Sequence, residues 1–178
     1  MTEPIDEVRL RTYQADDIKQ VAQAVIESKA ELTPWMPWCY ANYGHQDAQQ
    51  WVSTRAQAWQ IGTEKSFAIT DGEGQLLGGC GLHRLDPVNG VAEAGYWVRT
   101  SATGRGVATW ALGLLIGWGF KSGGLHRIEI IASTENVASQ RVAEKAKATR
   151  EGVLKSRLLL EGRRHDAVML TVMKSALS

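Results

Sequence analysis

The first third of the chain alternates between strand-like and helix-like patterns of apolar residues. Residues 8–13 alternate apolar and polar side chains, which predicts a half-buried strand. Residues 16–26 open with two aspartates and then carry apolar side chains at helical spacing. Residues 33–44 contain two prolines, an asparagine and a glycine without any period, which indicates an irregular loop. A second helix is predicted over residues 47–60.

The middle of the chain has the pattern of antiparallel strands. Residues 67–70 and 76–85 are apolar and are separated by a glycine-containing turn at 71–74, so they predict a hairpin. A second turn at 87–90 leads into a predicted strand over residues 91–99.

The last part of the chain alternates helices and strands. Residues 107–120 are apolar nearly all round, which predicts a helix buried on most faces. A strand follows at 127–132, and a strand–helix–strand unit of these lengths predicts that it pairs in parallel with the strand at 91–99. The remaining predicted elements are a helix at 138–146 and strands at 149–156 and 165–174. The expected fold is α/β, with a mixed, largely antiparallel sheet and helices on both faces.

Composition narrows the class of protein. The chain has 178 residues, which suits one domain spanning 1–178. A net charge of +1 provides no basic surface for nucleic acid. The longest apolar run, at 107–120, is shorter than the roughly 20 residues that a membrane helix needs. The acidic residues 1–7 do not predict a signal peptide, and two cysteines make no disulfide framework. A cytoplasmic protein is expected.

Residues 91–109 join a predicted strand, a glycine-containing turn and the start of a helix. Gly104 and Gly106 allow positive φ angles and a close approach of a ligand to the main chain. The helix that follows offers N–H groups at its positive end, which favours anion binding. A dinucleotide fingerprint is incomplete because Thr109 occupies its third glycine position, and the lysine of a phosphate P-loop is absent. A phosphate-binding loop and a simple packing turn both remain open.

Three short motifs occur in the order and at the spacing of a known family. Residues 103–108 match the acyl-CoA signature Q/R-G-x-G-x-G/A, with Thr103 in place of the first residue, and residues 93–97 and 135–139 match the flanking stretches. On these motifs the chain resembles the GNAT superfamily of acetyl-CoA-dependent N-acetyltransferases, and within it the branch that acetylates the N-terminal amines of ribosomal proteins. The order of elements agrees from about residue 8 to residue 174. The resemblance implies that the two parallel strands splay apart.

The resemblance also implies a cofactor site. Acetyl-CoA would be the co-substrate, with no metal, and its pantetheine arm would pair with the strand edge at Trp97, Val98 and Arg99. Asn136 would cap the helix after the next strand and hydrogen-bond the pantetheine, with Ser139 beside it. Main-chain N–H groups of the glycine turn would hold the pyrophosphate: Thr103, Gly104, Arg105, Gly106, Val107, Ala108 and Thr109.

Acetylation of an amine requires proton movements at two points. The attacking nitrogen must be neutral, whereas an α-amine has a pKa near 7.7–8.0, so a base assists. Glu93 is the candidate base, acting through water, because a carboxylate within a strand is costly to bury without purpose. Alternation places Glu93, Gly95 and Trp97 on one face of the sheet. The alternatives for Glu93 are a solvated position and a structural salt bridge.

The departing thiolate needs a proton in return. Many relatives have a tyrosine at the position that is Ala143 here, so Ser139 becomes the candidate acid, as the ribosomal branch implies. A capping role for this serine is the alternative. The histidines are dispersed without ligand spacing, so structural roles are favoured over a metal site.

The loop with Trp35 and Trp38 has the features of an acceptor site. Two tryptophans stand beside prolines in a non-periodic segment, and Tyr40 follows closely. These three residues are expected to contact the end of a peptide, the alternative being that they seal the core.

The expected function is therefore transfer of an acetyl group to a protein N-terminal α-amine by direct attack in a ternary complex. A small-molecule amine is the near alternative. A non-catalytic acyl-CoA-binding module and, more weakly, a nicotinamide-dependent oxidoreductase also stay open. The resemblance further implies a homodimer, and neither nucleic acid nor membrane is expected as a partner.

Overall fold

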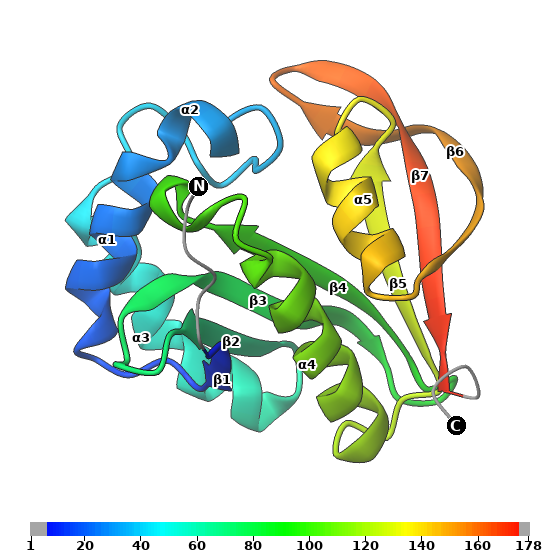
Figure 1. Cartoon of the computed structure of the whole chain (residues 1–178), viewed down its shortest axis with the longest axis horizontal. Helices are drawn as coiled ribbons and strands as arrows, with labels where there is room; N and C mark the ends of the chain where they lie inside the picture. Colours follow the sequence, from blue (N-terminus) through cyan, green and yellow to red (C-terminus); the bar gives the residue numbers. More distant parts are fainter. Residues whose placement is uncertain (1–6, 175–178) are drawn as a thin grey trace.

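The computed structural model describes residues 7–174 (Figure 1). The prediction about a signal peptide concerns residues 1–7, of which 1–6 lie outside the described residues. The strands are β1 (Arg9–Arg11), β2 (Lys65–Thr70), β3 (Leu76–Asp86), β4 (Val91–Val98), β5 (Arg127–Ser133), β6 (Thr149–Leu160) and β7 (Arg163–Met173). The helices are α1 (Asp17–Glu27), α2 (Lys29–Leu32), α3 (His45–Ile61), the 3₁₀ turn η1 (Thr100–Ala102), α4 (Val107–Lys121) and α5 (Val137–Lys145).

The strands form one sheet in the order β1-β2-β3-β4-β5-β7-β6. Every neighbouring pair is antiparallel except β4 and β5, which are parallel. The predicted mixed, mostly antiparallel sheet with one parallel pair is thereby confirmed.

The parallel pair is short and then opens. Only three residues of each strand pair, the last being Glu93 with Glu129, although β4 continues to Val98 and β5 to Ser133. Figure 1 shows the two strands side by side at one end of the sheet and apart at the other. The implied splay of the parallel strands is confirmed, and it places an opening within the sheet rather than at its edge.

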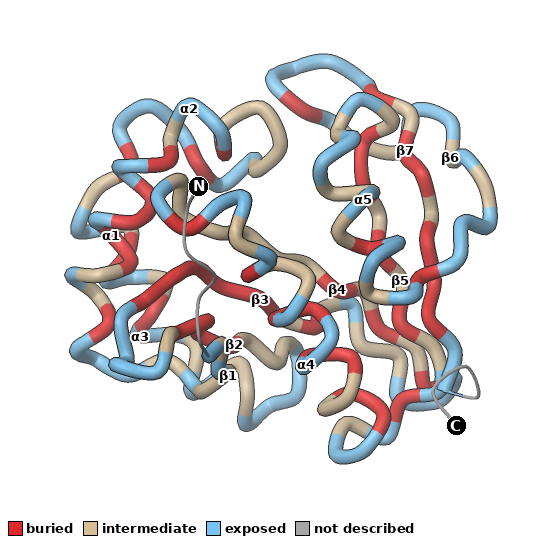
Figure 2. The backbone as a smooth tube through the Cα atoms, in the orientation of Figure 1, coloured by how far each residue is buried: buried red, intermediate tan, exposed pale blue. Residues whose placement is uncertain are grey.

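Helices cover both faces of the sheet, as predicted. One core cluster packs α4 against Phe67, Ile69 and Leu82 of the sheet. The other packs α1 and α3 against the opposite face, at Ala68 and Leu76. In Figure 2 the buried segments run through the sheet and along the helix sides that face it. Because side chains alternate along a strand, the strands β2, β3 and β4 contribute to both clusters.

Several local features differ from the expected elements. Strand β1 covers only Arg9–Arg11 of the expected 8–13, and β6 continues to Leu160, beyond the expected end at 156. Helix α2 and the turn η1 have too few residues to show a period, so the apolar pattern did not reveal them. Helix α3 begins at His45, two residues earlier than expected, because the Gly44 N–H donates to Asp47 Oδ2 at 2.8 Å and fixes the first turn. Within residues 7–174, no helix is long and apolar enough to cross a membrane.

Candidate active site

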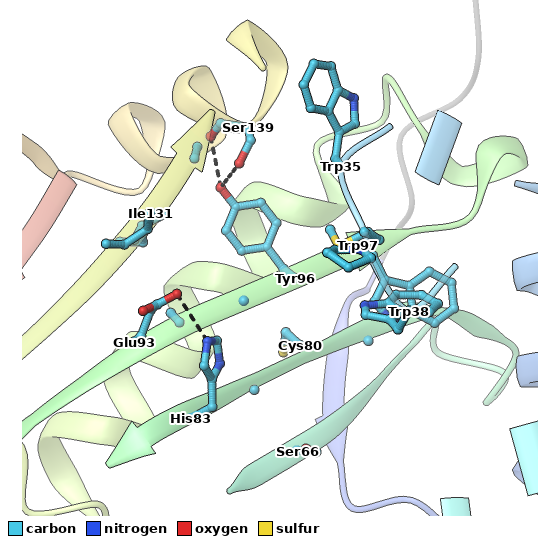
Figure 3. A pocket seen from close by; sticks show the side chains of 18 of the residues that line it. Trp35, Trp38, Ser66, Cys80, His83, Glu93, Tyr96, Trp97, Ile131 and Ser139 are labelled. Atoms are coloured by element: carbon cyan, nitrogen blue, oxygen red, sulfur yellow. Dashed lines mark hydrogen bonds and ion pairs between the residues drawn. The ribbon is translucent and has the colours of Figure 1, made fainter. Parts of the chain in front are cut away.

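A cavity of about 450 Å³ occupies the opening between β4 and β5. Its walls come from β3, β4, β5, α5 and the loop between α2 and α3, so segments distant in the sequence meet there. Figure 3 shows side chains from both faces of the sheet directed into this space. The lining residues that enter the argument below are Trp35, Trp38, His83, Glu93, Gly95, Tyr96, Trp97, Asn136 and Ser139.

The glycine turn has the geometry that its sequence predicts. Gly104 and Gly106 have φ angles of +73° and +80°, in the left-handed region that favours glycine. Gly106 is the N-cap of α4, and the Trp110 N–H donates to the Gly106 carbonyl at 3.1 Å. The N–H groups before Trp110 precede the helical hydrogen-bond ladder and lie at the positive end of a 15-residue helix. Thr103 Oγ1 instead donates to the Thr100 carbonyl at 2.8 Å.

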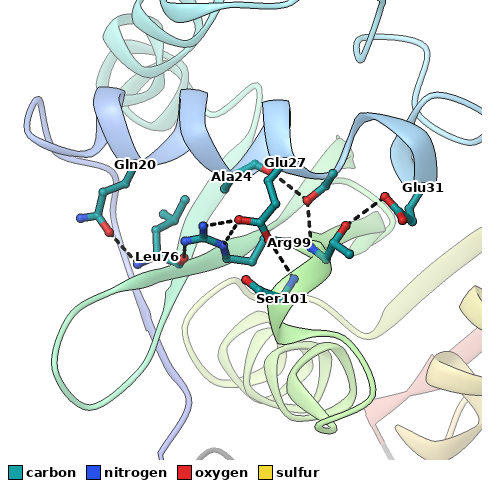
Figure 4. A network of polar contacts seen from close by, with 9 residues as sticks. Gln20, Ala24, Glu27, Glu31, Leu76, Arg99 and Ser101 are labelled. Carbon is teal, nitrogen blue, oxygen red and sulfur yellow. Dashed lines mark hydrogen bonds and ion pairs between the residues drawn. The ribbon is translucent and has the colours of Figure 1, made fainter. Parts of the chain in front are cut away.

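A polar network fixes the segment that leads into this turn (Figure 4). The Arg99 guanidinium bonds Glu27 of α1, and Glu27 Oε1 accepts the Ser101 N–H at 2.8 Å. The Thr100 N–H donates to Ser28 Oγ at 2.8 Å. Hydrogen bonding from Arg99, which outweighs burial, lowers the pKa of Glu27 to about 2. The side chain of Arg99 therefore anchors the turn to α1, and its main-chain N–H donates to Leu77 on β3.

The main chain at the end of β4 is paired with β3 on one side only, and of the three expected pantetheine contacts Trp97 alone lines the cavity. The Arg99 N–H donates to the Leu77 carbonyl at 2.8 Å. Because main-chain groups alternate in direction along a strand, those of Val98 face the opposite edge, toward the opening. Trp97 lies one residue back, and its side chain packs on the face covered by α1 and α3. Of the three expected pantetheine contacts, Val98 is the one whose main chain is placed to pair with a ligand.

Glu93 lies on the wall of the cavity, beside an imidazole and two guanidinium groups. His83 Nε2 lies 3.2 Å from Glu93 Oε1. The guanidinium groups of Arg84 and Arg157 lie 3.4 Å and 3.8 Å from Glu93 Oε2. Burial raises the pKa of Glu93, but the hydrogen bond with His83 and these positive charges outweigh burial and lower it below 4.5. The carboxylate is thus ionised at neutral pH. Glu93, Gly95 and Trp97 lie on one face of β4, as predicted. They pair with every second residue of β3, namely His83, Gly81 and Gly79.

A bulge in β3 brings His83 opposite Glu93. Asp86 pairs with Val91, but the next pair is His83 with Glu93, so two β3 residues face one residue of β4. Within the bulge, Arg84 has a φ angle of +49°, which is uncommon for a residue other than glycine. Without the bulge, the turn would place Arg84 opposite Glu93. Sequence reasoning missed His83 for this reason, because a bulge leaves no mark in the apolar pattern.

Ser139 lies on the other side of the opening, in contact with Tyr96. Tyr96 Oη lies 2.9 Å from the Ser139 carbonyl oxygen and 3.0 Å from Ser139 Oγ (Figure 3). Burial, opposed by the bond with Ser139, raises the pKa of Tyr96 to about 12, so the phenol keeps its proton. If the phenol donates to the carbonyl, the Ser139 hydroxyl keeps its own proton to donate. Asn136 Oδ1 accepts the Ser139 N–H at 3.1 Å, which confirms the predicted cap of α5.

An aromatic group lines the cavity on the face of Glu93. The rings of Trp38 and Trp97 lie 5.8 Å apart in a T-shaped contact, and Trp38 also packs on Tyr43. Trp35 belongs to the same wall. Tyr40 does not line the cavity, and its hydroxyl bonds Asp47 at the start of α3. The structure therefore brings together Trp35 and Trp38 but directs Tyr40 elsewhere.

Tyr96 is the second lining residue that sequence reasoning missed. It stands on β4 and contacts Ser139 on α5, 43 positions further along the chain. The only signal for it is its place inside the matched stretch 93–97. Within residues 7–174, no three His, Cys, Asp or Glu side chains come together as a metal site would require.

Comparisons with known proteins identify the family and the fold. Residues 7–149 match the family described as acetyltransferase (GNAT) domain. A ribosomal-protein-serine acetyltransferase of Escherichia coli (strain K12) is 30% identical over 158 residues, covering 87% of this chain and 88% of the relative. A solved ribosomal L7/L12 α-N-protein acetyltransferase in complex with coenzyme A has a TM-score of 0.87 at 25% identity, covering 96% of each chain. RimJ of Mycobacterium smegmatis, in complex with a CoA disulfide, has a TM-score of 0.90 at 25% identity, covering 98% of this chain and 85% of RimJ.

Proposed function

Because the chain belongs to the GNAT acetyltransferase family, we propose that it transfers the acetyl group of acetyl-CoA to the α-amine at a protein N-terminus. The observation that carries this proposal is the cavity through the splayed strands. One part of its wall has Tyr96, Asn136 and Ser139, and another has Glu93 and the tryptophans. The glycine turn at 104–106 follows β4 along the chain and does not itself line the cavity. A thioester entering beside the first part of the wall and an amine entering beside the second would meet inside the sheet.

The cofactor side fits the parts of acetyl-CoA. The N–H groups of residues 104–109 at the start of α4 suit a pyrophosphate. The free main-chain edge at Val98 suits the amide-containing pantetheine arm, and an N–H there would polarise the thioester carbonyl. The acetyl group would then lie beside Ser139, whose hydroxyl would protonate the departing sulfur. This placement needs mainly main-chain groups, so it tolerates Thr103 at the first position of the motif.

The acceptor side fits an ammonium group on a peptide. The ionised Glu93 supplies the negative charge toward which the surplus proton of the amine moves. Trp35 and Trp38 form a wall that suits the first residues of a chain. Named relatives acetylate ribosomal proteins, one of them at serine, so Ser is the first residue proposed for the acceptor. The resemblance to the ribosomal branch adds Ala.

Ligand-dependent stability tests the cofactor assignment. Thermal unfolding is followed with acetyl-CoA, CoA and NAD at matched concentrations. A ligand present at 100 times its Kd adds about 2.7 kcal/mol to the free energy of unfolding. Stabilisation by both CoA species but not by NAD is the expected result. An unfolding temperature that neither acetyl-CoA nor CoA changes would overturn the proposal, and residues 104–109 would then be a packing turn.

Two further expectations from the resemblance stay predictions. Cys39 and Cys80 are buried and free, as suits a reducing cytoplasm. Cell fractionation tests the cytoplasmic location, and sedimentation at micromolar concentration tests the homodimer.

A further inference from the structure

We propose that His83 is the group that takes the proton from the acceptor amine, with Glu93 as the positioning residue that fixes and charges the imidazole. This inference rests on the proposed acetyl transfer, because it assigns a role within that reaction. Sequence reasoning placed the base on Glu93 alone. The reassignment follows from how the two side chains meet and from what surrounds them.

The hydrogen bond to Glu93 sets the tautomer of His83. An ionised carboxylate only accepts hydrogen bonds, so the 3.2 Å contact requires a proton on Nε2 of His83. A neutral imidazole then has its lone pair on Nδ1. Among the residues that the structure describes, no protein group hydrogen-bonds Nδ1. The arrangement matches that of other catalytic pairs, in which a carboxylate orients a histidine base.

The Nδ1 edge of the ring is open toward the cavity. His83 lines the cavity, and its side chain is 35% exposed. The neighbouring position on β4 is Gly95, where a Cβ atom would lie 3.3 Å from Cε1 and 3.8 Å from Nδ1 of the ring. A side chain at position 95 would therefore crowd this edge. The β3 bulge, with its left-handed residue, is the local distortion that turns His83 toward Glu93.

The charges around the pair favour the histidine as the base. Arg84 and Arg157 also face Glu93, at 3.4 Å and 3.8 Å, and these two charges, with the hydrogen bond from His83, keep this carboxylate ionised. A carboxylate with a lowered pKa is a poor proton acceptor from an ammonium group, because basicity falls with pKa. The same carboxylate is well suited to stabilise an imidazolium next to it. Glu64 is the other carboxylate on the wall, and it is paired with Arg55.

The proposed step balances as follows. The α-ammonium gives one proton to Nδ1 of His83, which becomes an imidazolium beside the Glu93 carboxylate. The nitrogen lone pair forms a C–N bond to the thioester carbonyl carbon, and the C–S bond then breaks with its electron pair on sulfur. The second surplus proton of the nitrogen reaches the thiolate through the Ser139 hydroxyl. His83 finally releases its proton to solvent, so the products are the amide, CoA and one proton.

The variant His83→Gln distinguishes two roles of His83: a base that accepts a proton, and a residue that only hydrogen-bonds Glu93. The glutamine amide can still donate to Glu93, as Nε2 does, but it has no basic nitrogen. We expect kcat for a synthetic peptide with a free N-terminal serine to fall by about 10²–10⁴-fold, while the Kd for acetyl-CoA stays within about twofold. The control is His126→Gln, an exposed histidine outside the cavity, which should leave both values unchanged.

Chemical rescue supplies a readout that a structural role would not move. His83→Ala leaves space beside Gly95, and added imidazole should restore turnover in proportion to its free-base concentration. The same addition should not restore Glu93→Ala. Wild-type-like turnover of His83→Gln, or absence of rescue in a folded His83→Ala protein that binds acetyl-CoA, would overturn the role of His83 alone. Failure of the wild-type protein to acetylate the peptide in the same assay would overturn the proposed function together with it.

Discussion

The meeting of Glu93 and His83 on neighbouring strands determines how the proton of the amine is handled. The two residues pair directly across β3 and β4, and both line the cavity. Their chemistry differs because the carboxylate is surrounded by positive groups, whereas the imidazole keeps one open nitrogen. The half-buried carboxylate thus acts through its charge.

Replacing this carboxylate should therefore impair turnover and spare cofactor binding. Glu93→Gln keeps the shape but removes the charge that stabilises an imidazolium, so kcat should fall at least about 10²-fold. Isothermal titration should give an unchanged Kd for acetyl-CoA, because Glu93 lies on the acceptor side. The matched control is Glu129→Gln, a half-buried strand glutamate that pairs with Arg127 and does not line the cavity. Undiminished turnover of the Glu93 variant would remove this residue from the reaction.

Tyr96 and Ser139 should differ in how much each contributes. Loss of the Ser139 hydroxyl removes the proposed proton donor, so Ser139→Ala should lower kcat by about 10²-fold. Tyr96→Phe removes a hydrogen bond of about 1 kcal/mol that positions the serine, so a decrease of roughly fivefold is expected. Steady-state kinetics with Ser53→Ala, on the outer side of α3, as control checks this order. An effect of Tyr96→Phe as large as that of Ser139→Ala would make the tyrosine the donor.

For single residues, the sequence identified several members of the site but not the residues that contact them. The motifs place Glu93, Asn136 and Ser139 on the cavity wall, and the structure has all three there. His83 and Tyr96 were missed because their roles depend on contacts between separate elements, namely a bulged strand pair and a strand against a helix. Such contacts have no local pattern.

At the scale of elements, the start of α4 depends on two left-handed residues. Gly106 has a φ angle of +80° at the N-cap, so Gly106→Ala should cost about 1–2 kcal/mol of unfolding free energy. It should also weaken acetyl-CoA binding, since the turn would shift its N–H groups. Gly113→Ala, in the interior of the same helix with open space around it, should instead stabilise by about 0.8–1 kcal/mol. Urea denaturation of both variants tests the contrast, and destabilisation by both would contradict it.

The contact between α1 and the turn should make stability depend on pH. The pKa of Glu27 is lowered from 4.5 to about 2, so its pair with Arg99 stabilises the fold above pH 4.5 and is lost as pH falls toward 2. Glu27→Gln should cost roughly 1–3 kcal/mol at pH 7, and the difference from wild type should shrink below pH 4.5. Denaturation from pH 7 to pH 3 tests this, with the exposed Glu144→Gln as control. A difference that stays constant with pH would contradict the pairing.

Most elements follow from the apolar pattern, and the exceptions have a common cause. The strands β2 to β7 and the helices α1, α3, α4 and α5 are long enough to show a period. Helix α2 has four residues and η1 has three, which is less than the spacing that identifies a helix. These short turns are set by tertiary hydrogen bonds, such as that from the Thr100 N–H to Ser28 Oγ.

For the whole molecule, the central feature is a sheet that opens in its middle. Three paired positions hold β4 and β5 together at one end, and the cavity at the other end joins the two helix-covered faces. The sequence predicts the parallel pair, whereas the splay enters through family resemblance, because no residue pattern states where pairing stops. This opening lets a thioester and an amine approach the same point from opposite faces.

The most direct test of this account is acetyl transfer itself. The protein is incubated with acetyl-CoA and with synthetic peptides that differ only in their first residue, and fragmentation mass spectrometry locates any added acetyl group. We expect one acetyl group on the α-amine, added fastest to peptides that begin with Ser or Ala, and none on peptides with a blocked N-terminus. Binding of acetyl-CoA without transfer to any free α-amine would contradict it.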